Sequence, residues 1–272
     1  MNPDTTFDAS SLTENLKFRG FAVVHDFIPK EDLAQLRAAI PEAQARLKQE
    51  LAKTPRSLEI ADRVENGVVR IPMLFHPYFF KLLEQPNLIK VVDSTLGQTA
   101  VMHLMNAFAA APKPGSEGMF QEKYHRDFPR IVGGQLLSIN VILAVTDFSA
   151  DNGSTVLAPG THQVEPAPSQ QFLDSQAIQV EAPAGSALIF DSTILHRGSK
   201  NKTNVPRLFV NLQFTKSWIR QQFDYPRALP PEMLRGLPER SIQMLGFYVR
   251  VPTKLTEFYV PAEERLYRGG QG

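Results

Sequence analysis

Cysteine is absent from this sequence of 272 residues. The chain therefore forms no disulfide, no thiolate metal site and no cysteine nucleophile, and any metal ligands must be His, Asp or Glu side chains. An excess of charge of either sign is also missing, because 29 basic and 28 acidic residues give a formal net charge of +1. No overall electrostatic field favours nucleic acid or an anionic membrane, so we expect a small-molecule partner.

Long apolar runs are missing as well. No run approaches the length of a membrane span, and residues 1–11 are polar, without the apolar segment of a signal peptide. We therefore expect a soluble cytoplasmic protein with no nucleic-acid or membrane partner, present as a monomer or a small homo-oligomer.

The first hundred residues favour helices. Acidic residues follow Pro29, and Leu33, Leu36 and Ile40 recur at helical spacing, whereas Pro41 is expected to break or restart this helix. A chain of this length commonly forms one domain with a sizeable core. We expect a single domain over residues 1–272, helix-rich at 1–100, with a β core at about 101–218 and a C-terminal extension at 219–272.

A change to strands and turns follows residue 100. Between residues 135 and 148 the odd positions from 137 to 145 are apolar, whereas Ser138 and Asn140 lie on the opposite face. Residues 207–214 alternate in the same way and place Arg207, Asn211 and Gln213 on one face. A sheet packed on helices by one face and lining a polar cavity with the other gives this pattern. The sequence therefore predicts a mainly β fold with flanking α-helices, a double-stranded β-helix or jelly roll of the cupin-like kind.

The motif Tyr124-His125-Arg126-Asp127-Phe128 carries metal-ligand chemistry. On a strand, His125 and Asp127 at positions i and i+2 point the same way and can share one ion. A second histidine from a distant strand, such as His196, would complete two imidazoles and one carboxylate, the ligand set of non-haem Fe(II) oxygenases. The His-x-Asp pattern alone occurs by chance in many chains, so its weight depends on the segments around it.

Several of those segments share a pattern with a known family. They are Gly20-Phe21-Ala22-Val23-Val24-His25-Asp26-Phe27-Ile28-Pro29 before a helix, Lys113-Pro114-Gly115, His125-x-Asp127, Asn152-Gly153, Pro159-Gly160-Thr161-His162, and His196 with Arg207 eleven positions later. From Gly20 to about Trp218 the chain resembles the phytanoyl-CoA dioxygenase family of Fe(II)/2-oxoglutarate oxygenases, which includes ectoine hydroxylase.

The resemblance implies roles for individual residues. His125, Asp127 and His196 would bind Fe(II), and Arg207 would pair with the distal carboxylate of 2-oxoglutarate. A planar guanidinium matches a carboxylate through two hydrogen bonds, which agrees with that role. Halogenating relatives replace the carboxylate ligand with a small residue, so Asp127 predicts that this chain does not halogenate.

Asn140, and more weakly Asn106, would lie against the cosubstrate. Two positions depart from the family pattern. Gly198 stands where relatives often have a Ser or Thr that holds the cosubstrate carboxylate, and we leave open whether Ser199 replaces it. Tyr124 stands where the family commonly has Trp.

The resemblance further implies a 2-oxoglutarate-dependent dioxygenase that uses O₂ and oxidises an unactivated C–H bond of a small molecule, with release of succinate and CO₂. We expect hydroxylation, while desaturation, ring closure and epoxidation stay open. An amino-acid-like or natural-product substrate is expected rather than phytanoyl-CoA, since no dense basic cluster suits the CoA phosphates. Residues 128–130, 218–223 and 245–249 are expected around the substrate.

Two other classes compete with this hypothesis. A non-catalytic jelly-roll binding protein would typically lose a ligand or the arginine, and a cupin-type metalloenzyme that does not use 2-oxoglutarate would not need Arg207. Succinate formation separates these classes. His76 and His162 are interpreted as structural, and His25 and His103 have no partner at metal-site spacing.

Overall fold

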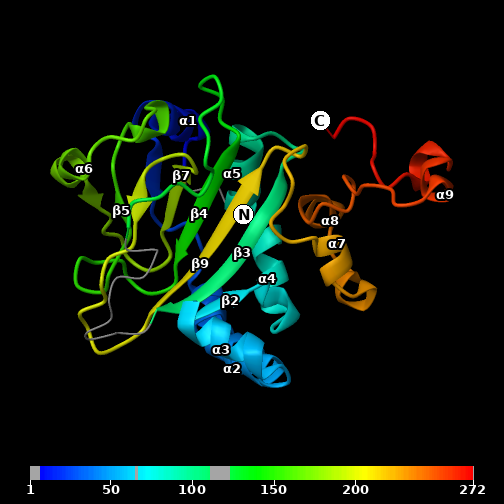
Figure 1. Cartoon of the computed structure of the whole chain (residues 1–272), viewed down its shortest axis with the longest axis horizontal. Helices are drawn as coiled ribbons and strands as arrows, with labels where there is room; N and C mark the ends of the chain where they lie inside the picture. Colours follow the sequence, from blue (N-terminus) through cyan, green and yellow to red (C-terminus); the bar gives the residue numbers. More distant parts are fainter. Residues whose placement is uncertain (1–6, 65–66, 111–122, 272) are drawn as a thin grey trace.

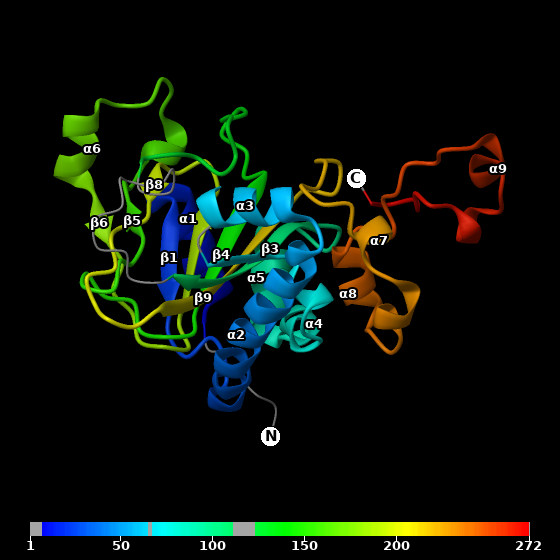
Figure 2. The same cartoon turned by 60° about the horizontal axis from the view of Figure 1, so that its bottom comes forward.

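Two antiparallel β-sheets form the centre of the molecule, in a computed structural model that describes residues 7–64, 67–110 and 123–271. The larger sheet has the strand order β1-β7-β4-β9-β3-β2 and the smaller one the order β6-β5-β8. The expected jelly roll is confirmed, and helices lie on one face of the larger sheet (Figures 1 and 2). The strands are β1 (Phe21–Val24), β2 (Val68–Arg70), β3 (Val101–Ala110), β4 (Ser138–Ala144), β5 (Val156–Leu157), β6 (Ile178–Gln179), β7 (Ala187–Asp191), β8 (His196–Arg197) and β9 (Arg207–Thr215).

Most of the longer helices come from the first hundred residues. The helices are α1 (Ala9–Arg19), α2 (Lys30–Ala52), α3 (Pro55–Val64), α4 (Tyr78–Lys81), α5 (Pro86–Thr95), α6 (Gln170–Gln176), α7 (Tyr225–Ala228), α8 (Glu239–Met244) and α9 (Leu255–Phe258). Short 3₁₀ turns add η1 (Pro72–Leu74), η2 (Leu82–Glu84), η4 (Thr161–Gln163), η5 (Pro231–Leu234) and η6 (Ala262–Glu264). Across the described residues, no helix is long and apolar enough to cross a membrane.

The outer face of the larger sheet forms the main hydrophobic core. Ile139 and Val141 of β4 and Leu212 of β9 are fully buried there against Leu36 and Ile40 of α2. Burying such side chains contributes about 1.5–3 kcal/mol each. The predicted apolar faces of β4 and β9 are therefore the faces that the helices cover.

The inner face of the same sheet has an apolar part and a polar part. Phe108 and Phe209 stack with ring centroids 4.2 Å apart, in a cluster that includes Leu157 of the smaller sheet. Asn140 faces Gln213 in the β4–β9 register and also lies on this inner face. The polar face predicted for these strands thus points into the space between the sheets.

One prediction about the helices is wrong. Pro41 does not break the helix, because α2 continues through it to Ala52. A proline removes one helical hydrogen bond and costs about 3 kcal/mol or more in a helix interior. Ala39, Ile40 and Ala43 around it are all fully buried, so packing on the sheet outweighs that loss.

The C-terminal segment covers an open edge of the larger sheet. Strand β2 pairs with β3 only at Asn106–Phe108, which leaves the preceding part of β3 without a strand neighbour on the side opposite β9. Gln221 Nε2 donates to the Met102 carbonyl at 2.6 Å, and the Gln222 N–H donates to the His103 carbonyl at 3.1 Å. Covering an edge in this way blocks pairing with another chain.

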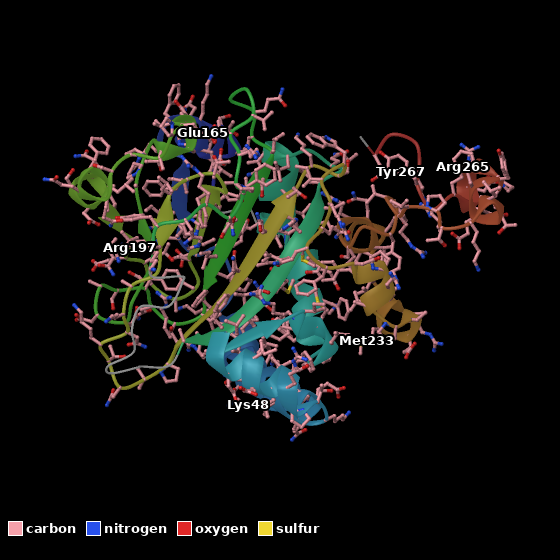
Figure 3. The ribbon with its side chains drawn as sticks, viewed as in Figure 1. Lys48, Glu165, Arg197, Met233, Arg265 and Tyr267 are labelled. Carbon is pink, nitrogen blue, oxygen red and sulfur yellow. The ribbon has the colours of Figure 1, made fainter. Side chains whose placement is uncertain are left out.

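After this contact Tyr225, Met244 and Leu245 still join the main core, and only from about Val251 does the chain project away from the sheets. Figures 1 and 2 show α9 at the far end of this projection, and Figure 3 places Arg265 and Tyr267 on it, opposite Arg197. Val251 and Leu255 on the projection are 81% and 73% exposed, so it adds little to the core.

Candidate metal centre

A short backbone bridge brings two histidines together. The N–H of His125 donates to the His196 carbonyl at 3.0 Å, and the N–H of His196 donates back at 3.1 Å. Within residues 124–128 only His125 forms this isolated antiparallel bridge, and the expected strand is absent there. The expected facing survives this correction, because His125 and Asp127 still converge on one point. The centroids of the two imidazole rings lie 4.3 Å apart.

Asp127 completes a cluster of three possible ligands. Its Oδ1 lies 3.5 Å from His125 Nε2, and its Oδ2 lies 3.5 Å from His196 Nε2. The three ligand atoms all lie within 4.8 Å of one another. Adjacent ligands of a six-coordinate ion with bonds of about 2.1 Å are about 3 Å apart, so a small closure would seat a metal.

Backbone carbonyls orient both rings. His125 Nδ1 lies 2.9 Å from the Lys123 carbonyl, and His196 Nδ1 lies 3.1 Å from the Ile194 carbonyl. In a neutral ring these contacts hold the proton on Nδ1, so the lone pair is on Nε2, the atom that faces Asp127.

A buried hydrogen-bond chain holds the carboxylate. Asn140 Nδ2 donates to Asp127 Oδ2 at 2.9 Å and to Asn211 Oδ1 at 3.0 Å. Ser192 Oγ donates to Asn140 Oδ1 at 2.6 Å, and Ser138 Oγ donates to Ser192 Oγ at 2.8 Å. Because Asn140 uses both amide protons and its carbonyl, its orientation and that of Asp127 are fixed.

The electrostatics favour an ionised carboxylate between two rings. Burial raises the pKa of Asp127, but His196, His125 and Asn140 outweigh burial and bring this pKa below its ordinary value. Burial lowers the pKa of His196. For His125, burial lowers the pKa, but the hydrogen bond and the charge of Asp127 together with the Lys123 carbonyl outweigh burial, so its pKa is raised. A bound cation would replace the proton that these groups compete for.

Arg207 lies on the inner face of β9 and is almost fully buried, at 7% exposure. Its Nη1 donates to the Gly153 carbonyl, its guanidinium lies over the Phe209 ring at 4.6 Å, and its buried Nε has no hydrogen-bond partner within the described ranges. No acidic side chain forms an ion pair with it among the described residues. Burial lowers the pKa of Arg207 to about 10, which leaves the side chain cationic at neutral pH.

The turn that holds Arg207 has a second unpaired polar atom. Ser154 Oγ is buried and has no hydrogen-bond partner in the described part of the chain. Gly153 has φ +79°, and a Cβ there would collide with the backbone of Ser199 and Asn201. Glycine therefore permits the turn that places the Gly153 carbonyl against Arg207.

Comparison with known proteins identifies the family. The family model described as phytanoyl-CoA dioxygenase matches residues 17–209. This chain belongs to the phytanoyl-CoA dioxygenase family. The Mycobacterium tuberculosis protein named "Uncharacterized protein Rv1501" is 39% identical over 255 residues, which cover 93% of this chain and 92% of that protein.

Solved structures show the same fold at low sequence identity. The epimerase SnoN in complex with Fe³⁺, alpha ketoglutarate and nogalamycin RO aligns at a TM-score of 0.57 and 14% identity, over 82% of this chain and 90% of that one. EctD from S. alaskensis with 2-oxoglutarate and 5-hydroxyectoine aligns at 0.58 and 17% identity, over 79% of this chain and 78% of that one.

Asn140 and Asn106, the two asparagines expected near the cosubstrate, both have hydrogen-bond partners within the protein. Asn140 contacts the carboxylate of Asp127 directly. Asn106 is buried on β3, and with its amide turned to satisfy both neighbours it accepts from Arg70 Nη1 at 3.3 Å and donates to the Met105 carbonyl at 3.0 Å. The Ser199 hydroxyl donates to the Ser154 carbonyl at 2.8 Å, so its proton is engaged.

Other expectations concern residues around the site. Lys113–Gly115 and the loop at residues 112–118 lie outside the described residues. His162 is buried, with Nε2 3.1 Å from the Lys17 carbonyl, as a structural histidine would be. Trp218, the first residue of the expected 218–223 segment, is 61% exposed, so it is not packed against the sheet.

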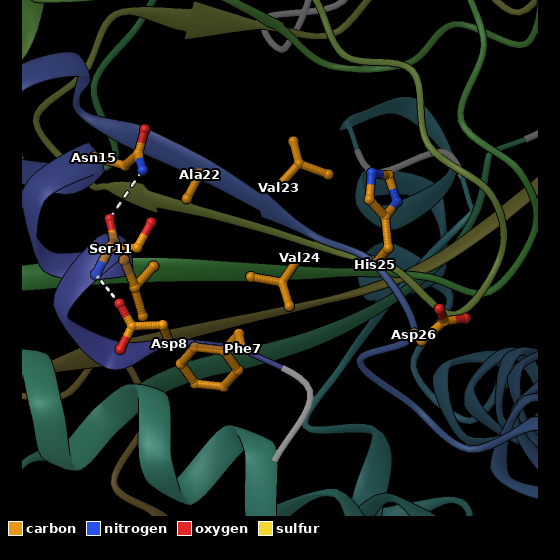
Figure 4. Close-up of a pocket in the computed structure, with 10 residues that line it drawn as sticks. Phe7, Asp8, Ser11, Asn15, Ala22, Val23, Val24, His25 and Asp26 are labelled. Carbon is orange, nitrogen blue, oxygen red and sulfur yellow. Dashed lines mark hydrogen bonds between the residues drawn. The ribbon is translucent and has the colours of Figure 1, made fainter. Parts of the chain in front are cut away.

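A surface hollow lies elsewhere in this family member. It measures about 370 Å³ between α1 and β1, and Figure 4 shows Asp8, Ser11 and Asn15 along one side and His25 near its far end. Asp8 accepts from the Ser10 and Ser11 N–H groups at the start of α1. His25 Nδ1 lies 3.2 Å from Ser186 Oγ. Both groups have local structural partners, and the hollow holds none of the three clustered ligands.

The sequence did not single out Ser138, Ser192 or Ser154. Ser138 was noted only for its polar face, and Ser192 immediately follows β7, where nothing in its neighbours marks it. Their role depends on which atoms lie opposite in space. Only the β4–β7 pairing, in which Ile139 faces Asp191, brings Ser192 next to Ser138.

Proposed function

We propose that this chain is an Fe(II)/2-oxoglutarate-dependent oxygenase that uses O₂ to oxidise an unactivated C–H bond of a small molecule. The observation that carries the proposal is a His–Asp–His cluster that contacts the inner sheet face through Asn140, on the same face as a buried arginine that has no counter-charge among the described residues. The cluster suits a ferrous ion, and the arginine suits the far carboxylate of a dicarboxylic acid.

The three clustered residues suit iron in chemistry as well as in position. His125 and His196 present Nε2, and Asp127 presents an oxygen on either side. Two imidazoles and one carboxylate leave the remaining positions of a six-coordinate ion open for other ligands. The Asp127 carboxylate also supports hydroxylating rather than halogenating chemistry.

Arg207 suits the distal carboxylate of 2-oxoglutarate. It lies four residues before Asn211 on the same face of β9, a step of about 13 Å at the rise of a β-strand. Asn211 is linked to Asp127 through Asn140. A five-carbon dicarboxylate and an extended arginine side chain together can cross this distance, and the unpaired Arg207 Nε and Ser154 Oγ would gain acceptors.

When bound, iron and 2-oxoglutarate supply the O₂-dependent oxidation of a C–H bond, with release of succinate and CO₂. The chain supplies orientation. Lys123 and Ile194 carbonyls keep the Nε2 atoms of the histidines turned inward, and Asn140 keeps the carboxylate turned toward them. Phe108 and Phe209 exclude water beside the arginine, which strengthens its attraction for an anion.

We further propose hydroxylation of an amino-acid-like or natural-product molecule by a cytoplasmic protein in which residues 1–272 act as one domain. Strands β1 and β2 of the first hundred residues form the edges of the same sheet that holds Asn140 and Arg207, which supports one catalytic unit. The near-balanced charge supports a small partner rather than nucleic acid or a membrane.

Succinate release tests the proposal. The purified chain with Fe(II), 2-oxoglutarate and O₂ is screened against small molecules, and mass spectrometry looks for a gain of one oxygen or a loss of two hydrogens in the substrate. A non-catalytic binding protein or a cupin-type metalloenzyme would form no succinate. The matched control is His162→Gln, which removes a buried histidine outside the cluster and should leave iron binding intact.

A further inference from the structure

A β-bulge on β3 contains a histidine, His103, to which no role has been assigned so far. The β3–β9 register shifts between Met102 and Leu104, so His103 is an extra residue opposite Gln213. Gln213 in turn faces Asn140, which holds Asp127. Bulges often re-aim a side chain next to an active site, and the charge of Asp127 acts on the His103 ring.

The backbone of the bulge is held from outside. Gln221 Nε2 bonds the Met102 carbonyl and the Gln222 N–H bonds the His103 carbonyl. Gly246 has φ +87°, and a Cβ there would collide with the Gln221 side chain. The C-terminal segment therefore fixes the backbone on which the His103 ring is carried.

The His103 ring is incompletely satisfied. It hydrogen-bonds to the backbone of Arg220, whereas its buried Nδ1 has no partner among the described residues. Burial lowers the pKa of His103, against contributions from Arg220 and Asp127 that raise it, so the ring is neutral at pH 7. With its proton on the nitrogen that meets the Arg220 carbonyl, the ring presents Nδ1 as an acceptor.

A second unfilled polar atom lies at the same end of the sheet. Thr215 pairs with Ser138 on one side and with Val101 on the other, two residues beyond Gln213 on the inner face. Its Oγ1 is fully buried and has no hydrogen-bond partner. The nearby Ser138 is already bonded to Ser192 and Gln213. Buried polar atoms are rarely left unpaired, so two such atoms together indicate a missing ligand group.

We propose that His103 determines substrate specificity by accepting a hydrogen bond through Nδ1 from a hydroxyl or N–H group of the substrate. The inference rests on the proposed oxygenase function, because it names a feature of that enzyme's substrate. Thr215 Oγ1 supplies a second polar contact for the same group. Substrates are therefore alcohols or amines rather than hydrocarbons without a hydrogen-bond donor.

Matched pairs of small molecules test this role. Alcohols and amines are compared with their O-methyl ethers and N,N-dimethyl derivatives as stimulators of succinate release. Removing the donor should lower kcat/KM about tenfold in the wild type. The ratio of kcat/KM for the compound with the donor to kcat/KM for its methylated partner is the donor preference. In His103→Leu this ratio should fall close to one. His103→Asn keeps an acceptor near the Nδ1 position and should retain most of the preference. The control His76→Leu, on a half-buried histidine packed against Phe79, should leave the ratio unchanged.

An unchanged ratio in His103→Leu, or equal stimulation by the methylated compounds, would overturn the proposal. Independently of any substrate, ¹⁵N NMR of the full chain labelled in histidine and loaded with Zn(II) and 2-oxoglutarate reports the tautomer. We expect His103 Nδ1 to be unprotonated. The His103 signal is assigned by its loss in His103→Asn. A proton on Nδ1 would equally overturn the proposed role of His103. Wild-type and His103→Leu protein should bind Zn(II) and 2-oxoglutarate alike. Failure of both to bind would count against the oxygenase function instead.

Discussion

The inner face of the jelly roll has a metal end and an arginine end, and the groups that hold Asp127 at the first are more completely paired than the groups around Arg207 at the second. At the metal end, Asn140 and Ser192 use their donors within a continuous hydrogen-bond chain that ends on Asp127. At the arginine end, Arg207 Nε and Ser154 Oγ are buried and unpaired. The first end is built to hold side chains in place before any ligand arrives. The second is complete only when an anion fills it.

This difference has an energetic consequence. A buried charge without a partner destabilises the folded state, whereas a satisfied polar network costs little and restricts the geometry. The free protein therefore bears the cost of keeping Arg207 dehydrated between Phe148 and Phe209, at 5.3 and 4.6 Å from their rings. Binding of a dicarboxylate offsets that cost, so the bound protein should be clearly more stable toward unfolding than the free protein.

The largest expected effect is at the metal end. Asp127→Ala removes the carboxylate that both histidines face, so we expect loss of metal binding and a fall of more than about 100-fold in turnover. Isothermal titration with Fe(II) under anaerobic conditions and succinate release check this. Asp191→Asn is the matched control, since Asp191 is buried and bonded to Thr193 away from the cluster. Equal metal affinity in both variants would contradict the ligand assignment.

Substitution at the arginine end should separate binding from stability. Arg207→Gln should raise the KM for 2-oxoglutarate about 10- to 150-fold, the range expected from losing a charge-assisted hydrogen bond of about 1.5–3 kcal/mol. The same variant should melt no lower than the wild type when free, because it removes an unpaired buried cation.

Thermal melts with and without 2-oxoglutarate measure stability and cosubstrate binding, and succinate release at varied 2-oxoglutarate concentration measures the KM. Arg240→Gln is the matched control, since Arg240 pairs with Asp93 at 2.6 Å and should lose stability without any change in KM. An Arg207→Gln protein that melts well below the wild type yet keeps the wild-type KM would assign Arg207 a purely structural role.

The hydrogen-bond chain behind the carboxylate should have an intermediate effect. Asn140→Ala removes the donor to Asp127 Oδ2 and should weaken metal affinity about 10- to 100-fold while leaving the three ligands in place. Ser138→Ala, at the far end of the chain, should lower metal affinity much less. Comparing the two metal affinities shows whether orientation is transmitted along the chain or depends on Asn140 alone.

Much of this arrangement follows from the sequence because it depends on local periodicity. Alternation along residues 135–148 and 207–214 assigns Asn140, Arg207 and Asn211 to one face, and the structure places that face inside. The spacing of His125 and Asp127 likewise gives a common direction even though a single bridge replaces the expected strand. Residues i and i+2 still point the same way in an irregular segment, because the direction of a side chain depends only on the neighbouring backbone.

Features that depend on tertiary contacts could not be predicted in this way. The continuity of α2 through Pro41 depends on burial against the sheet, which outweighs the local preference. The position of His103 could not be predicted either, because it is an inserted residue in β3 and alternation along a strand cannot indicate a bulge. The unpaired Ser154 Oγ is visible only when the residues around it are known.

The smallest expected effect distinguishes two serines beside Arg207. Ser199 was the candidate to replace the hydroxyl missing at Gly198, yet its Oγ donates to the Ser154 carbonyl at 2.8 Å and accepts from Gln179 Nε2 at 2.7 Å. Ser199→Ala should therefore cost about 1 kcal/mol of folding stability per lost hydrogen bond and leave the KM for 2-oxoglutarate unchanged. Ser154→Ala removes an unpaired hydroxyl next to the Gly153 turn, so it should not destabilise the free protein but should raise that KM a few-fold. The reverse pattern, a raised KM in Ser199→Ala only, would mean that Ser199 turns away from Ser154 when the cosubstrate binds, and that the arginine end is rebuilt on binding rather than merely filled.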